Sequence, residues 1–489
     1  MLDEATIADL RTSMASGSLT SRALTETYLA RIESIDPALR SVLQTNPDAL
    51  EIADALDAER RSGRVRGPLH GIPVLVKDNI DTADRMRTTA GSFALGEVTP
   101  AHDAAVVELL RAAGAVILGK ANLSEWANFR STRSSSGWSA RGGQCVNPYA
   151  PDRSPCGSSS GSGVAVSANL CAVAVGTETD GSIICPSSIN GLVGIKPTVG
   201  LVSRSGVIPV SHSQDTPGPM ARSVADAAAL LTALAGADGR DAATTGAHVE
   251  LDYGGFVDPD GLRGARIGVA RNLAGFNDRI DRLFEDALAA MSDLGAEIVD
   301  PADIRHVDEL EEPELEVLLY EFRADLEAYL GSLGPAQPHR TLADLIAFNE
   351  EQADAEMPFF GQELFEQAAA KGPLTEPAYV ESLATCRRLS RVEGIDAVMD
   401  EHRLEALVAP SNAPAWRIDH ANGDHYVGGN STPAAVAGYP NVTVPMGFAF
   451  DLPIGISFLG RAWSEGTLIR FASAFEHATR HRRPPEVEG

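Results

Sequence analysis

The spacing of apolar and polar positions predicts helices first and then strands alternating with helices. In residues 1–66 the pattern predicts two helices, one beginning at a Thr20 or Ser21 cap and one ending at Gly63. We expect these helices to pack on the outside of the core.

Residues 67–237 alternate short apolar runs with helical patterns. One run, Ile72 to Val76, reads as a buried strand, and AAVVELLRAAGAVILGKANL reads as a helix followed by a strand, with Gly114 at the turn. Such alternation favours a mostly parallel mixed central sheet covered by helices on both faces, an α/β fold.

The rest of the chain predicts a continuation of that core and one added lobe. Residues 238–300 carry a strand in GLRGARIGVA and a helix over Asp278 to Leu294. Residues 301–390 are acidic and helical, and we expect a helical lobe at the rim of the active-site cleft, packed through Leu315, Leu318, Leu319, Phe322 and Leu326. Residues 391–489 return to strands (Ala406 to Ala409, Asn441 to Pro445, Ile454 to Leu459) and a final helix from Ser464 to Arg480, completing one continuous catalytic domain.

The stretch from Pro155 to Thr198 departs from an ordinary core pattern. Glycine and serine crowd two clusters around Ser158 and Ser182, and a small-residue apolar run joins them. A flexible linker is one interpretation, but the run is too apolar for a solvated linker. We favour a loop, a short helix over Gly161 to Leu170, a buried strand over Ala172 to Gly176, and a second glycine loop whose N–H groups face a ligand.

A serine in such a loop is a candidate nucleophile that needs a base. None of the eleven histidines lies in this stretch, although a triad partner can be distant in sequence. Lys77 follows the apolar run Ile72 to Val76, where burial would lower its pKa and leave a neutral amine able to accept a proton. A solvated surface lysine is the alternative, and Lys120, after a similar run, is a second candidate base.

Four motifs in order resemble the amidase signature family. They are KDNI at Lys77, GSSSGSG at Ser158, GTETDGSI ending in Ser182, and INGLVGIKPT after it. The resemblance covers Gly71 to Ala228, including SQDTPGPMARSVADAA, and weaker features, ALVAPS and AAVAGYPNVTVPMG, reach the C-terminus. It implies the fold of that family and hydrolysis of carboxamides through a Ser-Ser-Lys triad and an acyl-enzyme.

Carried over residue by residue, the resemblance implies Ser182 as nucleophile, Ser158 as bridging serine after a cis Gly157–Ser158 bond, and Lys77 as general base. The backbone N–H groups of Thr179, Asp180, Gly181 and Ser182 would then hold the oxyanion. An upstream supporting serine of the family aligns to Ser134, although the segment from Arg130 to Ser136 departs from the usual pattern.

Two departures from the common pattern, Asp180-Gly181-Ser182 and Cys156-Gly157-Ser158, look like the bacterial peptide amidase branch, as do NLSEWANFR and SGWSARGGQ. The expected reaction is therefore deamidation of C-terminal peptide amides, with Asp180 either contacting the substrate or only capping its loop. Alternatives are an amidase for aryl, aliphatic or fatty amides, a subunit of a tRNA-dependent amidotransferase, and an α/β-hydrolase with Ser159 as nucleophile.

The composition of the chain argues against two classes of partner, nucleic acids and membranes. The formal charge of −27 over 489 residues argues against nucleic-acid binding, and no apolar run is long enough to span a membrane. We expect a small-molecule or peptide amide substrate and a monomer or homo-oligomer, with no metal or cofactor implied.

The N-terminus has no secretory pattern, although a trimmed secreted form would look the same. An odd number of cysteines without zinc spacing suggests free thiols in the cytoplasm: Cys145, Cys156, Cys171, Cys185 and Cys386. A nucleophilic Cys156 or Cys185 is conceivable from their positions beside the two serines.

Overall fold

An eleven-stranded sheet runs through the computed structural model, which describes residues 4–96, 99–335 and 337–487. In order across the sheet the strands are β1 (Val42–Thr45), β3 (Val116–Ala121), β2 (Pro73–Lys77), β6 (Val173–Glu178), β8 (Thr216–Ala221), β7 (Val193–Lys196), β12 (Asn441–Ala449), β13 (Leu452–Leu459), β11 (Ala406–Pro410), β9 (Arg266–Val269) and β10 (Glu297–Val299). A separate short hairpin pairs β4 (Trp138–Ser139) with β5 (Gly143–Gln144).

The α/β class and the mixed sheet are confirmed, but the sheet is more antiparallel than expected. Parallel pairs form two blocks, β3–β2–β6 and β11–β9–β10. The remaining neighbours pair antiparallel. Between β12 and β13 only Phe450 and Asp451 intervene, with φ of 57° and 61°. Such a two-residue turn forces antiparallel neighbours, and it lacks the glycine by which a sequence usually signals it.

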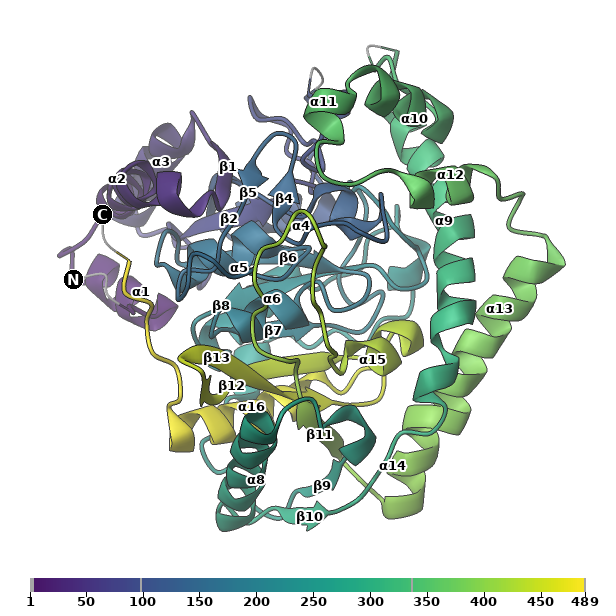
Figure 1. Ribbon diagram of the computed structural model, residues 1–489. Coiled ribbons are helices and arrows are strands. Elements are labelled where there is room, and N and C mark those ends of the chain that lie inside the picture. The colour runs from purple at the N-terminus through teal and green to yellow at the C-terminus, as the bar shows by residue number, and fades with distance from the viewer. Residues whose placement is uncertain (1–3, 97–98, 336, 488–489) are drawn as a thin grey trace.

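Helices cover both faces of the sheet (Figure 1). Outside the acidic segment they are α1 (Ile7–Ala15), α2 (Ser21–Leu39), α3 (Ala49–Arg61), α4 (Ala105–Ala112), α5 (Ser160–Ser167), α6 (Ile184–Ile189), α7 (Val224–Leu234), α8 (Asp278–Asp293), α14 (Asp396–His402), α15 (Ser431–Ala437) and α16 (Glu465–Thr479). Thr20 caps α2, its side chain accepting the Ala23 N–H. Helix α1 and strand β1 were not expected, since β1 is a four-residue strand without a buried position.

The acidic segment forms α9 (Glu311–Ser332), α10 (Leu342–Glu351), α11 (Ala353–Glu356), α12 (Glu363–Ala369) and α13 (Pro377–Arg387), which stand along one side of the molecule (Figure 1). A π-helical run, Arg388–Ile395, joins α13 to α14. Of the predicted stripe on α9, Leu319, Phe322 and Leu326 are buried and Leu318 is partly buried.

Leu315 was wrongly expected in that stripe, because it is 38% exposed. The first turns of α9 pack instead through Val317 and Tyr320 against Tyr379 of α13. That contact uses a different face of the helix, which leaves Leu315 toward solvent.

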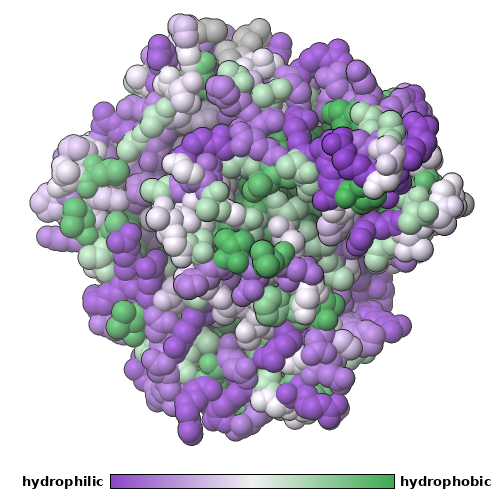
Figure 2. All heavy atoms as spheres, turned by 180° about the vertical axis from the view of Figure 1, so that it is seen from behind, coloured by the Kyte–Doolittle hydropathy of each residue, from purple (hydrophilic) through white to green (hydrophobic). Residues whose placement is uncertain are grey.

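The core lies on both sides of the central strands, where every residue of β2 and β6 is buried. Seen from behind, the surface is mostly hydrophilic, with hydrophobic residues in small groups (Figure 2). Among the described residues, no helix combines the length and apolar character needed to cross a membrane. Strands β2 and β6 are therefore buried along their whole length, and each ends in an ionisable side chain, Lys77 and Glu178.

Candidate active site

Lys77 is the last residue of β2 and is fully buried. Its Nζ lies 2.8 Å from Ser158 Oγ, 2.9 Å from Thr177 Oγ1 and 3.2 Å from the Thr177 carbonyl oxygen. Burial lowers the pKa of Lys77 to about 7, against the opposing charges of Asp215 and Glu178. About half of the amine is therefore neutral near pH 7.

Three oxygen atoms surround Lys77 Nζ, and they can accept its three N–H groups when the amine is charged. An uncharged amine has two N–H groups and one lone pair, so one of its three neighbours must donate. The Thr177 carbonyl cannot donate, and Thr177 Oγ1 also accepts from Asn79 Nδ2 at 3.0 Å. When the amine is neutral, the hydroxyl of Ser158 or that of Thr177 can direct its proton at the lone pair.

Ser158 lies in the loop before α5 and is fully buried. The Gly157–Ser158 peptide bond is cis, as the resemblance implied. A Cβ on Gly157 would come within 2.1 Å of Ser124 Oγ. Glycine is required there because the backbone runs against the Ser124 side chain, while the Ser124 N–H donates to the Ser158 carbonyl at 3.0 Å.

Ser182 lies in the second glycine loop, between β6 and α6. Gly181 before it has a φ of 77°, a left-handed conformation that favours glycine. The carboxylate of Glu178 accepts the N–H groups of Ile183 at 2.7 Å and Ile184 at 2.9 Å, which fixes the chain just after Ser182. Among the described residues, the N–H groups of Asp180, Gly181 and Ser182 make no hydrogen bond and remain free for a ligand.

The two glycine loops meet directly, since the Ser159 N–H donates to the Ser182 carbonyl at 3.2 Å. The structure thus brings Lys77, Ser158 and Ser182 into one site. Only the Lys77–Ser158 link is hydrogen-bonded, because within the described chain no hydrogen bond joins the Ser158 and Ser182 hydroxyls. Catalytic hydrogen bonds without substrate are often long, and tighten when substrate binds.

Thr179 and Asp180 are held at the other side of the second loop. Thr179 Oγ1 donates to Asp215 at 2.6 Å, and Thr432 Oγ1 donates to Asp180 Oδ2 at 2.6 Å. Burial raises the pKa of the Asp180 carboxyl. Both contacts orient the loop that carries the free N–H groups.

A cavity of about 370 Å³ opens beside this loop. Its lining includes the predicted Gly157, Asp180, Gly181 and Ser134, with Asn128, Ser131, Thr132, Ser136, Cys156, Cys185, Leu364, Trp416, Asp424, Tyr426, Ser431 and Thr432. Ser134 also donates to the Ser131 carbonyl at 2.8 Å. The volume suits a small organic ligand or a short peptide end.

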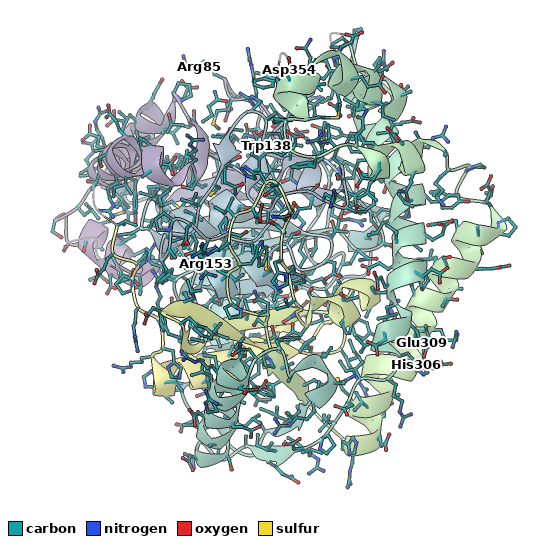
Figure 3. All side chains as sticks on the ribbon, in the orientation of Figure 1. Arg85, Trp138, Arg153, His306, Glu309 and Asp354 are labelled. Carbon is teal, nitrogen blue, oxygen red and sulfur yellow. A yellow bond between two sulfur atoms is a disulfide. The ribbon has the colours of Figure 1, made fainter. Side chains whose placement is uncertain are left out.

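One wall of the cavity comes from residues 411–430, here called the strap, which sequence reasoning missed. The strap leaves β11 and crosses in front of the core (Figure 1). Its Trp416 carbonyl accepts the Ser154 N–H at 2.8 Å, and its Ala415 carbonyl accepts from Arg153, labelled beside it in Figure 3, at 3.0 Å. Pro414, the Asn422-Gly423 pair and the two glycines Gly428 and Gly429 signal a loop in the sequence, but no local pattern places that loop over the site.

Cys156 and Cys185 form a disulfide, with 6.0 Å between their Cα atoms. The expectation of free thiols is therefore wrong for these two residues, and neither can be a nucleophile. Cys145, Cys171 and Cys386 are buried free cysteines. The pairing was hidden because the cysteines are 29 residues apart and meet only when the two serine loops converge.

The rival residues have other partners. Lys120 Nζ contacts the Ile80 carbonyl and lies 2.8 Å from Thr88 Oγ1, with no contact to Ser158. Ser159 Oγ donates to the Thr177 carbonyl at 3.0 Å and accepts the Thr177 N–H at 3.1 Å. Each is thereby occupied in binding the backbone of its neighbours.

Comparison with known proteins identifies the family to which the chain belongs. Residues 23–469 match the family described as Amidase. A probable amidase of Arabidopsis thaliana is 43% identical over 496 residues, covering 99% of this chain and 92% of its own. The native peptide amidase of Stenotrophomonas maltophilia has a similar structure, with a TM-score of 0.95, 53% identity and 99% of both chains covered. A glutamyl-tRNA(Gln) amidotransferase chain of Symbiobacterium thermophilum is 35% identical over 509 residues, covering 98% of each.

Proposed function

Since the chain belongs to the amidase family, we propose that it is an amide hydrolase whose substrates are C-terminal peptide amides, released as peptide acid and ammonia. Hydrolysis of amides follows from the family. The choice of peptide amides rests on the similarity to a peptide amidase over 99% of both chains. The observation that carries the mechanism is the buried Lys77 amine 2.8 Å from the Ser158 hydroxyl.

In this mechanism Lys77 accepts a proton from Ser158 Oγ, and Ser158 in turn accepts one from Ser182 Oγ as that oxygen attacks the amide carbon. The direction of transfer follows from the lowered pKa of Lys77, which supplies a base near neutral pH. Ser182 lies before α6 in the loop that Glu178 holds, so its oxygen is carried by a rigid backbone.

The carbonyl oxygen becomes negatively charged in the tetrahedral intermediate. The N–H groups of Asp180, Gly181 and Ser182, which lack partners within the described chain, support its stabilisation, and Thr179 completes the set expected from the sequence. Collapse of the intermediate breaks the C–N bond, and the proton returns through Ser158 to the leaving nitrogen. Water then attacks the acyl-enzyme by the same relay and releases the carboxylic acid.

The Cys156–Cys185 disulfide bears on the cell compartment in which the protein works. A cytoplasmic location was expected partly from free thiols, and the Cys156–Cys185 disulfide removes that support. Fractionation of the producing cells, followed by thiol titration of the recovered protein, assigns both the compartment and the redox state.

The test of the function uses Ser182→Ala and a panel of amides. Wild-type protein should release ammonia from peptide amides, and the variant should lose at least about 10⁴-fold in kcat, with an unchanged melting temperature, because only the nucleophile is removed. A matched control is Ser213→Ala, which changes a partly exposed serine in a later loop. If glutamine or aryl amides are the better substrates, or if Ser182→Ala turns over peptide amides, the proposal is wrong.

A further inference from the structure

We propose that the cavity beside the glycine loop binds a positively charged group, so that peptide amides with an alkylammonium or guanidinium close to the carboxamide are preferred substrates. This inference rests on the proposed function and specifies which peptide amides the same site takes. The cation can come from a basic side chain or from the free N-terminus of a short peptide.

The carboxyl groups that line the cavity have no basic side chain beside them in that lining, and a nearby cation would favour their charged forms against the burial that raises the pKa of Asp180. Of the residues described as its lining, only Asp180 and Asp424 are ionisable carboxylates, and none is a lysine, arginine or histidine. Asp180 comes from the glycine loop and Asp424 from the strap, so the two charges approach the cavity from different segments. A cation between them would be attracted by both.

In each of the two carboxylates only one oxygen atom has a hydrogen-bond partner among the described residues. Asp180 Oδ2 accepts from Thr432, and Asp424 Oδ2 accepts the Ser136 N–H at 2.8 Å. The Oδ1 atoms of both are buried and have no hydrogen-bond partner among the described residues. A buried carboxylate without full hydrogen bonding is unfavourable, and a nearby cation offsets part of that cost.

Two aromatic rings line the same cavity and point independently to a cation. Trp416 and Tyr426, both on the strap, meet edge to face with ring centroids 5.5 Å apart. The faces of aromatic rings attract ammonium and guanidinium groups, and pockets that combine them with carboxylates are typical of cation binding. Beneath Trp416 the Cys156–Cys185 disulfide packs as an apolar floor, which limits solvent access on that side.

The strap also fixes where these groups stand. His420 stacks on Phe359 with centroids 3.9 Å apart, and its Nε2 lies 2.9 Å from Gln144 Oε1. Because both contacts lie a few residues before Asp424, the carboxylate and Tyr426 are held over the cavity. The same negative charges disfavour the carboxylate that the reaction produces, which promotes release of the peptide acid.

The test compares kcat/KM for N-acetyl-Ala-Lys-amide with its neutral and acidic counterparts, N-acetyl-Ala-norleucine-amide and N-acetyl-Ala-Glu-amide. We expect a preference of about tenfold for lysine over norleucine, with glutamate poorer than both, and a smaller preference at higher salt. A second arm compares Ala-norleucine-amide with and without the N-acetyl group, which tells whether the N-terminal ammonium supplies the cation.

Two substitutions on the strap test whether the preference for a cationic substrate depends on Asp424. Asp424→Asn should reduce the preference at least about threefold. Asp419→Asn, which changes a partly exposed aspartate on the same strap that is not among the residues described as lining the cavity, should keep it. Equal rates for the lysine, norleucine and glutamate amides in the first arm, together with equal rates for the acetylated and free forms of Ala-norleucine-amide in the second, would overturn the inference while leaving peptide amide hydrolysis intact. Failure of the folded protein to release ammonia from every peptide amide would instead refute the proposed function.

Discussion

The protonation of Lys77 gives the sharpest prediction. With a pKa of about 7, the neutral fraction is roughly 90% at pH 8, 50% at pH 7 and 9% at pH 6. If the neutral amine is the base, kcat/KM should fall about tenfold from its plateau between pH 8 and pH 6. Ammonia release from a neutral peptide amide, measured from pH 6 to pH 8, gives this acidic limb of the pH–rate profile.

Loss of the folded protein should not cause the predicted fall in kcat/KM between pH 8 and pH 6. A lysine whose pKa is lowered in the fold makes the unfolded chain bind more protons only between about pH 7 and pH 10.5, so it raises stability with pH in that window and changes nothing below it. Buried acids with raised pKa values act oppositely. Glu476 at about 7 and Asp215 at about 6 bind protons more readily in the fold, so their contribution to stability is lost as pH rises. From pH 8 to pH 6 the Lys77 contribution to stability falls while those of Glu476 and Asp215 rise, so these contributions offset one another and the melting temperature should not drop.

Two variants separate Lys77 from other titrating groups. Asp215→Asn removes a charge that raises the pKa of Lys77, so the limb should move to lower pH. Lys77→Ala should reduce kcat by at least about 10³-fold at every pH, whereas Lys371→Ala, which removes a partly exposed lysine paired with Glu316, should leave the profile unchanged. A flat profile between pH 6 and pH 8 in folded wild-type protein would refute the reasoning.

Two further predictions concern the loops that carry the serines. Replacing both Cys156 and Cys185 by serine should lower the free energy of unfolding by about 3–4 kcal/mol, because the disulfide joins residues 29 positions apart. Urea titration measures this change. Adding a dithiol should lower the urea midpoint of the wild-type protein but not that of the variant. Gly181→Ala should lower the free energy of unfolding by about 1–2 kcal/mol, because alanine is strained at a φ of 77° and its Cβ would lie 2.9 Å from Ser431 Oγ. A variant with wild-type kcat would show that the loop does not hold the oxyanion.

The proposed catalytic residues lie in glycine-rich motifs that are local in the chain and resemble those of the amidase signature family, whereas the apolar pattern alone left both Lys77 and Lys120 open as the base. Ser158 and Ser182 flank one helix and one strand, and their glycine motifs are local in the chain. Lys77 ends β2, and β2 pairs in parallel with β6, so its side chain emerges beside Thr177 just past the end of the paired register. Parallel adjacent strands bring their carboxyl ends to one edge, and apolar runs identify such strands well.

The antiparallel part of the sheet, the disulfide and the strap depend on contacts that no local pattern encodes. Phe450 and Asp451 form a tight turn without glycine, and Cys156 meets Cys185 only after two loops converge. The strap lies more than 200 residues beyond Ser182 and has no regular secondary structure of its own, so hydrophobic periodicity could not position Asp424.

This division has a physical consequence for the enzyme. The proposed relay from Lys77 to Ser158 lies at a strand end and in a buried loop, which tolerate little change in packing. The cavity wall is instead a loop held by a few contacts, such as the Ser136 N–H to Asp424 and the stack of His420 on Phe359. Substitutions on the strap should therefore alter which amide is preferred while leaving the pH limb at about 7, because Lys77 contacts no strap residue within the described chain. A strap variant that moved that limb would show that substrate selection and proton transfer share one set of contacts.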